Sequence, residues 1–304
     1  AMKDLRDTIE SNSTSVPNSV NYINADKNLQ IEFDEALQQA SATSSKTSEN
    51  PATIEEVLGL SQAIYDTKNA LNGEQRLATE KSKDLKLIKG LKDLNKAQLE
   101  DVTNKVNSAN TLTELSQLTQ STLELNDKMK LLRDKLKTLV NPVKASLNYR
   151  NADYNLKRQF NKALKEAKGV LNKNSGTNVN INDIQHLLTQ IDNAKDQLNG
   201  ERRLKEHQQK SEVFIIKELD ILNNAQKAAI INQIRASKDI KIINQIVDNA
   251  IELNDAMQGL KEHVAQLTAT TKDNIEYLNA DEDHKLQYDY AINLRSEEHT
   301  SELQ

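Results

Sequence analysis

Apolar residues follow a helical period along most of the chain. The clearest run has spacings of three, four or seven residues, which place its members on one face of a helix. It consists of Leu112, Leu115, Leu118, Leu125, Met129, Leu132, Leu136 and Leu139. No Gly or Pro interrupts the run before Pro142. The pattern predicts one helix of about 30 residues, which would be about 45 Å long.

Turn and capping residues divide residues 1–127 into six predicted helices. The first spans about residues 2–13, the second begins at Asn24 or Asp26, and the third begins at Thr53. The fourth ends near Gly90, the fifth begins at Asn95 and the sixth begins at Thr111. Thr53 with Glu56, Asn95 with Gln98 and Thr111 with Glu114 have the spacing of a capping box. We therefore expect a three-helix bundle followed by a second, smaller one.

The whole arrangement returns with a period of 127 or 128 residues. The recurring sets are Tyr22, Asn24, Ala25 and Asp26; Tyr149, Asn151, Ala152 and Asp153; and Tyr277, Asn279, Ala280 and Asp281. The tetrad that begins at Leu71 (Leu-Asn-Gly-Glu) likewise returns at Leu198. Met2 aligns with Met129 and Met257, so we expect the chain to begin partway along a helix of a longer repeat array.

Composition supports an all-α fold. Gly (7) and Pro (3) are scarce and lie mainly between the periodic segments, which leaves long stretches free to be helical. Aromatic residues make up 3% of the chain and Trp is absent, which suits several thin cores of Leu, Ile, Val and Ala. The predicted fold is a series of tandem three-helix bundles that long shared helices join into an elongated rod.

Charge and cysteine usage narrow the possible partners. The net charge is −5 with both signs interleaved along the chain, so we expect no basic stripe and no nucleic-acid partner. The absence of Cys excludes disulfides and thiolate chemistry. No apolar run approaches the roughly 20 residues of a membrane span, so any signal or anchor would lie outside this fragment.

Six of the ten aromatic residues fall at two repeat positions. These are Tyr22, Tyr149 and Tyr277 at one position and Phe33, Phe160 and Tyr288 at the other. A ligand groove lined by these rings is one interpretation. Rings at helical spacing in an aromatic-poor bundle are more often core, and we expect that role here.

The sequence offers no candidate catalytic, cofactor-binding or metal-binding residue. The histidines are His186, His207, His263, His284 and His299, and no two have the helical spacing of a metal site. We expect the recurring Asp26, Asp153 and Asp281 to cap helices or favour their first turns. The five lysines of residues 81–92 indicate a solvated helix face, with a polyanion-binding patch as the weaker alternative. We expect no enzymatic activity and no cofactor.

The repeated motifs resemble two known modules. The Tyr-x-Asn-Ala-Asp and Leu-Asn-Gly-Glu segments resemble FIVAR three-helix modules, and the segments that begin at Leu94 and Leu222 (Leu-Asn-x-Ala-Gln) resemble GA modules. Their alternation over about residues 2–294 is similar to that of giant staphylococcal surface proteins. The resemblance implies an exported protein associated with the membrane or wall, binding to host matrix such as fibronectin, and a part in envelope integrity.

The expected domain limits follow from the repeat and the resemblance. We expect FIVAR-like bundles at 1–78, 128–204 and, truncated, 256–294, and GA-like bundles at 79–127 and 205–255. Residues 295–304 depart from the repeat and are expected to be a non-native tail. The predicted function is a structural and adhesive rod at the bacterial surface, and we expect a monomer. The alternative is a dedicated module for a serum protein such as albumin. Residues 96–106 and 224–234 contain no aromatic, which argues against albumin, and no partner-binding surface is evident.

Overall fold

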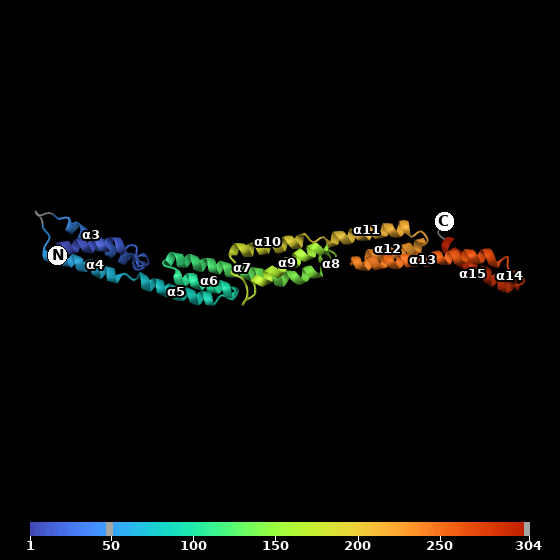
Figure 1. The fold of residues 1–304 in the computed structure, drawn as a ribbon, viewed down its shortest axis with the longest axis horizontal. Helices are drawn as coiled ribbons and strands as arrows, with labels where there is room; N and C mark the ends of the chain where they lie inside the picture. Colours follow the sequence, from blue (N-terminus) through green and yellow to red (C-terminus); the bar gives the residue numbers. More distant parts are fainter. Residues whose placement is uncertain (47–50, 301–304) are drawn as a thin grey trace. The chain divides into compact units, whose positions relative to one another are not determined.

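The computed structural model describes the backbone of residues 1–46 and 51–300 and the side chains of residues 1–46 and 51–294. Every regular element in these ranges is a helix (Figure 1), which confirms the predicted all-α fold. The chain divides into two compact units, one made of residues 1–136 and 163–190 and the other of residues 137–162 and 191–304. The expected tail lies outside the described side chains.

Fifteen helices occur in the described ranges. The first repeat contains α1 (Met2–Ser15), α2 (Val20–Ile23), α3 (Lys27–Ser44), α4 (Ile54–Ala70), α5 (Gly73–Lys89), α6 (Lys96–Ser108) and α7 (Leu112–Ala145). The remaining helices are α8 (Leu147–Arg150), α9 (Tyr154–Val170), α10 (Ile181–Asp196), α11 (Gly200–Glu218), α12 (Asn224–Ala236), α13 (Ile240–Thr271), α14 (Ile275–Leu278) and α15 (Glu282–Thr300).

The prediction of six helices per repeat is wrong by one short element. The four-residue helix α2 follows Ser19, whose side chain accepts a hydrogen bond from the Tyr22 N–H. Equivalent turns form α8 after Ser146 and α14 after Asn274. A single capped turn has too few apolar positions to show a period, so the hydrophobic pattern did not reveal it.

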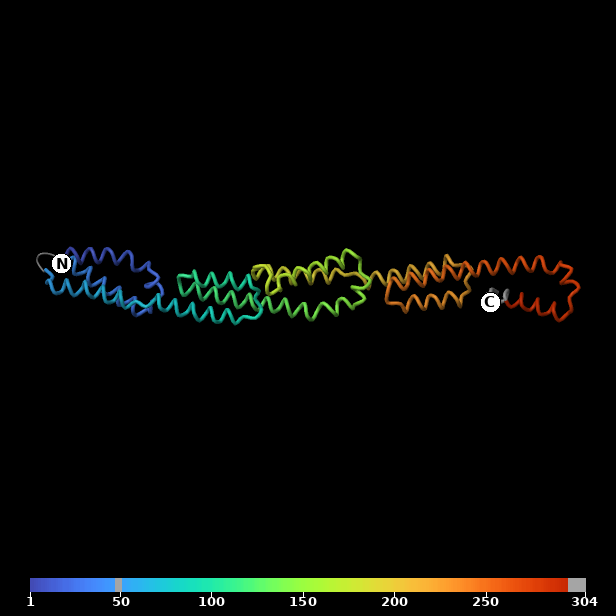
Figure 2. The backbone as a smooth tube through the Cα atoms, turned by 60° about the horizontal axis from the view of Figure 1, so that its bottom comes forward, coloured from blue at the N-terminus to red at the C-terminus, as the bar shows by residue number. Residues whose placement is uncertain are grey.

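The long predicted helix is present as α7, with 34 residues. The sequence placed its end at Pro142, whereas the helix continues to Ala145 with the exposed Pro142 inside. Helix α13 has 32 residues and continues through Gly259. Helix α4 passes into α5 with only a short break at Leu71 and Asn72, and the trace keeps its direction there (Figure 2).

Capping residues begin the helices largely as predicted. Both hydrogen bonds of a capping box are present for Thr53 with Glu56, for Asn95 with Gln98, and for Asn223 with Gln226. The remaining predicted pair forms only half of a capping box. The Thr111 hydroxyl accepts from the Glu114 N–H, but the Glu114 carboxylate accepts from the Asn110 N–H.

Two of the apolar cores lie in the first unit. Helices α1, α3 and α4 surround Leu5, Val16, Ala25, Phe33, Ala36, Ala40, Val57, Ile64 and Leu71. Helices α5, α6 and α7 surround Leu77, Ile88, Val102, Val106, Ala109 and Leu115. The second unit has a comparable core within α11, α12 and α13, made of Leu204, Ile215, Leu219, Leu222, Ile230, Ile234, Ile243 and Ala250. These are the thin, aliphatic cores that the composition favours.

A core role was predicted for all six recurring aromatic residues. It is confirmed for the two phenylalanines, whereas the four tyrosines are only partly buried. Phe33 and Phe160 are fully buried. Tyr22 and Tyr149 pack edge-on against them, with ring centroids 6.0 and 5.9 Å apart. The Tyr22 hydroxyl donates to Asp34, and burial together with this hydrogen bond raises the pKa of Tyr22 to about 12. The rings of each pair thus pack against each other within the bundle.

Candidate functional site at the repeated module junction

The break between α4 and α5 lies against the turn that joins α2 to α3. A Cβ atom on Gly73 would lie 2.1 Å from the Asn21 carbonyl oxygen and 2.7 Å from the Ala25 nitrogen. Real Cβ atoms do not approach backbone so closely, so this contact requires glycine. In the second repeat, a Cβ on Gly200 would lie 2.3 Å from the Asn148 carbonyl oxygen. The Leu-Asn-Gly-Glu motif therefore marks a close crossing of two backbone segments.

Polar side chains fasten this crossing. Asn72 donates to the Asp26 carboxylate at 2.7 Å and accepts from the Asp26 N–H at 3.0 Å. Arg76 forms an ion pair with Asp26 at 3.3 Å and donates to the Asn24 carbonyl at 2.6 Å. Because one carboxylate is shared by an amide and a guanidinium, the two segments are held at several points.

The second repeat has the same contacts. Asn199 donates to the Asp153 carboxylate at 2.6 Å, and Arg203 pairs with it at 3.0 Å. Arg203 also donates to the Asn151 carbonyl at 2.6 Å. The backbone crossing therefore has the same polar contacts in both repeats.

A buried asparagine extends the crossing to the last helix of the smaller bundle. Asn24 is 3% exposed. Its oxygen accepts from the Leu112 N–H at 2.7 Å, and its amide donates to the Asn110 carbonyl at 2.9 Å and the Val20 carbonyl at 2.8 Å. We call Asn24 with Asn110 and Leu112, and its equivalent in the second repeat, the asparagine clasp. It joins the turn after α2 to the start of α7.

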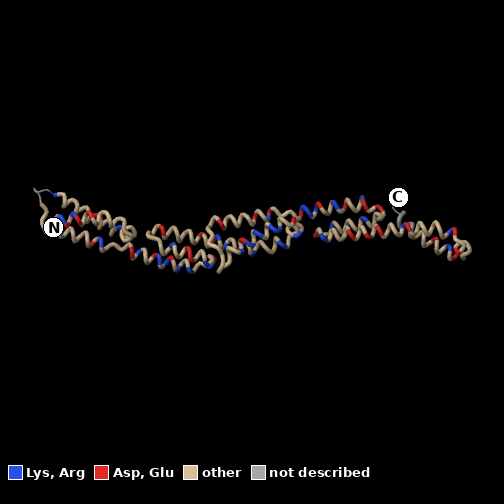
Figure 3. Tube along the Cα trace, in the orientation of Figure 1, with Lys and Arg blue, Asp and Glu red and all other residues tan. Residues whose placement is uncertain are grey.

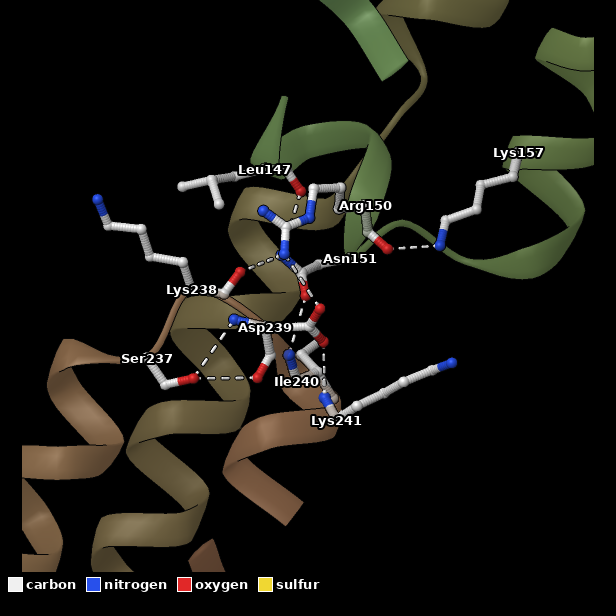
Figure 4. Close-up of polar contacts among 9 residues, drawn as sticks. All are labelled: Leu147, Arg150, Asn151, Lys157, Ser237, Lys238, Asp239, Ile240 and Lys241. Atoms are coloured by element: carbon white, nitrogen blue, oxygen red, sulfur yellow. Dashed lines mark hydrogen bonds and ion pairs between the residues drawn. The ribbon is translucent and has the colours of Figure 1, made fainter. Parts of the chain in front are cut away.

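Figure 4 shows the clasp of the second repeat. Asn151 accepts from the Ile240 N–H at 3.0 Å and donates to the Lys238 carbonyl at 3.1 Å and the Leu147 carbonyl at 3.3 Å. Arg150 adds an ion pair with Asp239 at 3.3 Å. Asp239 also caps α13, so the clasp and the helix cap are adjacent.

The prediction that the recurring aspartates cap helices is wrong for Asp26. Asp26 stands at the N-cap position of α3, but its side chain makes no capping hydrogen bond. The carboxylate points instead to Asn72 and Arg76. The sequence analysis also missed the role of Asn24 and Asn151. The signal was present, because an asparagine recurs at this position in all three copies.

A second set of contacts in the first unit joins α6 to the loop after α9. The amide of the fully buried Asn95 donates to the Val170 carbonyl at 3.1 Å and to the Thr177 carbonyl at 2.9 Å. Gln98 donates to the Val179 carbonyl at 3.0 Å. The capping-box pair therefore uses its remaining amide protons to bind a segment about 80 residues away.

A lysine completes this contact. Lys173 donates to the carbonyls of Lys92 and Leu94. Burial, and then the nearby positive charge of Arg133, lower the pKa of Lys173. Arg133 itself is paired with Asp93. Both ends of the smaller bundle of the first unit thus meet their neighbours through specific polar contacts.

The described side chains contain no group of three or more His, Cys, Asp or Glu residues placed to hold a metal ion. His186, His263 and His284 are exposed, whereas the half-buried His207 lies 2.6 Å from Asn244. His299 lies outside the described side chains. In the described ranges, no helix combines the length and the apolar composition that crossing a membrane requires.

The clasp leads to a direct prediction. Replacing Asn151 by Ala should lower the free energy of unfolding of the second unit by about 2 kcal/mol, because a helix start loses its partner and a buried carbonyl loses its donor. Urea unfolding followed by circular dichroism measures this difference. The matched control is Asn155→Ala, since Asn155 is exposed on α9. Equal unfolding midpoints for the two variants would contradict the role of the clasp.

Two family models match the chain. The FIVAR domain model matches residues 1–72, 128–199 and 256–294. The GA module model matches residues 74–128 and 202–256. The two modules alternate along the chain, and the asparagine clasp joins each complete FIVAR match to the GA match that follows it.

Named relatives and a solved structure agree with these matches. Extracellular matrix-binding protein ebh of Staphylococcus aureus strain MW2 is 32% identical over 294 residues, which cover 97% of this chain and 3% of the relative. EbhA of strain Newman is 31% identical, with 97% and 8% covered. The chain therefore spans less than a tenth of the length of either relative.

A crystal structure of an EbhA fragment from S. aureus has the same fold. Its TM-score is 0.74 at 24% sequence identity, and the match covers 82% of this chain and 98% of that one. The FIVAR matches alone cover more than half of the present chain. The chain therefore belongs to the FIVAR domain family, with GA modules between its FIVAR domains.

Proposed function

We propose that this chain is a non-catalytic structural and adhesive segment of a bacterial surface protein, in which clasped modules act as a stiff rod. The observation that supports the proposal is the asparagine clasp, with the same contacts in both repeats. A segment with one local binding function would not need the same hydrogen bonds at successive module junctions. A spacer of fixed geometry does need them, because its stiffness is set by its weakest joint.

The energetics of the clasp favour stiffness. Bending a FIVAR module away from its GA module would separate Asn24 from Leu112 and leave buried donors and acceptors unpaired. Each such group costs about 1–3 kcal/mol. The glycine contact and the Asp26–Arg76 ion pair would open with it. A junction fastened at these points resists bending more than a flexible linker does.

The adhesive part of the proposal comes from the relatives. They are named extracellular matrix-binding proteins, which supports a location outside the cell and a partner in the host matrix. We propose fibronectin as this partner. We also propose that the chain contributes to envelope integrity. Many weakly binding modules on one rod would gain affinity through avidity.

Small-angle X-ray scattering tests the rod. A single compact domain of this length would have a radius of gyration of about 19 Å, whereas we expect a maximum dimension above about 100 Å for bundles stacked end to end. The double variant Asn24→Ala/Asn151→Ala should broaden the distance distribution. The control Asn28→Ala/Asn155→Ala changes two exposed residues and should scatter like the parent chain. A compact parent particle would overturn the proposal.

Binding to immobilised fibronectin and albumin separates the adhesive role from its alternative. We expect measurable binding to fibronectin and none to albumin, because α6 and α12 contain no aromatic residue to anchor a partner. Albumin binding by a single bundle would instead support a dedicated serum-protein module. Binding to neither protein would exclude fibronectin as the partner. The spacer role would then be judged by the scattering experiment alone.

A further inference from the structure

Helix α9 has a cationic face. Five of its 17 residues are Lys or Arg, and Glu166 is its single acidic residue. Blue Lys and Arg positions recur along α9 in the charge-coloured trace (Figure 3). Arg158, Lys162, Lys165 and Lys168 follow at spacings of four, three and three residues, which place them on one side of the helix. All four are exposed. We call these four residues the α9 stripe.

The stripe is particular to the second FIVAR module. At its positions the first module has Ile31, Glu35, Gln38 and Ser41. Helix α3 contains one Lys and three acidic residues, the reverse of the balance in α9. The described part of α15 also has one Lys and three acidic residues. The same helix of the same module is therefore basic in one copy and acidic in the other two.

The surrounding segment is basic as well. Residues 128–173 contain thirteen Lys or Arg and three Asp or Glu, a net charge of +10, whereas the equivalent residues 1–46 have a net charge of −3. The expectation of interleaved charges without a basic stripe is therefore wrong for this module. The chain average of −5 concealed it, because the acidic remainder more than balances the basic segment.

The fold does not account for three of the four stripe residues. Like charges three or four residues apart on a helix destabilise it. Among the described side chains, Arg158, Lys165 and Lys168 have no ion-pair partner. The first and third modules form the equivalent helix without these charges. A role outside the bundle is therefore the better explanation.

We propose that the α9 stripe binds a sulfated polysaccharide of the extracellular matrix. The four charges extend over about 15 Å, with successive rises of about 4.5–6 Å. These rises are shorter than the Debye length of about 8 Å at physiological salt, so the charges act together on a linear polyanion. The identification of this polyanion as a matrix component rests on the proposed function.

An aromatic residue extends the stripe. Tyr154 precedes Arg158 by one turn and is 76% exposed. An exposed aromatic face packs against the apolar face of a sugar ring and, equally, against a nucleic-acid base. The matrix-binding names of the relatives favour the polysaccharide, and nucleic acid becomes an outcome of the test.

The test uses the full chain and immobilised heparin as the probe. The variant Arg158→Gln/Lys162→Gln/Lys165→Gln/Lys168→Gln removes the stripe and keeps good helix formers. The matched control Lys205→Gln/Lys210→Gln/Lys217→Gln/Lys241→Gln removes the same charge from exposed positions of the second GA module. A third variant, Lys162→Arg/Lys165→Arg/Lys168→Arg, keeps the charge. Circular dichroism establishes that each variant is folded.

We expect the stripe variant to bind heparin about tenfold more weakly than the parent at about 0.15 M salt, with a smaller dependence of affinity on salt. The control and the arginine variant should bind like the parent. Transferring the stripe to the first module with Ile31→Arg/Glu35→Lys/Gln38→Lys/Ser41→Lys should increase heparin binding.

Three results would overturn the proposal. These are no heparin binding by the parent, equal losses in the stripe and control variants, and tighter binding to duplex DNA than to heparin. The third result would identify the stripe as a nucleic-acid site. Fibronectin binding is measured in parallel on the same variants. A failure to bind fibronectin would count against the proposed partner and leave the heparin result intact, so the two failures are distinguishable.

Discussion

Replacing Phe33 by Ala should lower the free energy of unfolding of the first compact unit by about 3–5 kcal/mol. Phe33 is fully buried among α1, α3 and α4, where its neighbours include Leu5 and Ile64. The substitution removes the largest side chain of a core that is otherwise aliphatic, and it leaves the Tyr22 ring without its edge-on partner. Urea unfolding followed by circular dichroism gives the change.

The control for this substitution is Tyr65→Ala on α4. The Tyr65 ring is 60% exposed, so the variant should change the free energy of unfolding by less than about 0.5 kcal/mol. Phe160→Ala should behave like Phe33→Ala, because Phe160 is also fully buried and packs edge-on with Tyr149. A Phe33→Ala variant with the parent's unfolding midpoint would show that the ring is not a core residue.

Replacing Gly73 by Ala should destabilise the first unit by about 2 kcal/mol or more, because small-to-large changes against a fixed backbone force the chain apart. Helix propensity alone predicts the opposite, since Ala is favoured over Gly in a helix by about 1 kcal/mol. The close contact decides the sign of the change in stability, because the new Cβ would lie 2.1 Å from the Asn21 carbonyl oxygen. The same argument applies to Gly200.

Gly59→Ala is the matched substitution. Gly59 lies inside α4, and nothing stands within 4 Å of the position that a Cβ would occupy. Propensity then acts alone, and the variant should gain about 0.5–1 kcal/mol of stability. Opposite signs for Gly73→Ala and Gly59→Ala in one series of urea unfolding curves are the expected result. A stabilised Gly73→Ala variant would show that the crossing is looser than the structure describes.

Local patterns predicted the helices and most of their starts. Capping boxes such as Thr53 with Glu56 involve residues three apart, so the sequence contains both partners of each hydrogen bond. The burial of Phe33 followed in the same way from helical spacing in an aromatic-poor chain. The short helix α2 was missed because one turn is too short to show a period.

The sequence analysis missed the basic segment of the second FIVAR module for a different reason. Every residue of the α9 stripe was visible in the sequence, but the net charge of −5 for the whole chain concealed a segment of +10. A charge count for each repeat, made after the repeat had been recognised, would have found it. The repeat was the correct unit for counting because equivalent helices occupy equivalent places in each module.

The sequence by itself determined the all-α fold, the repeat of 127 or 128 residues and the burial of Phe33 and Phe160, because helical spacing and self-similarity are both visible along the chain. The tertiary structure alone decided what Asp26, Asn24 and Gly73 do. Asp26 binds Asn72, 46 residues away, and Asn24 binds Leu112, 88 residues away. No local pattern specifies such partners, since they meet only when helices far apart in the sequence have packed together.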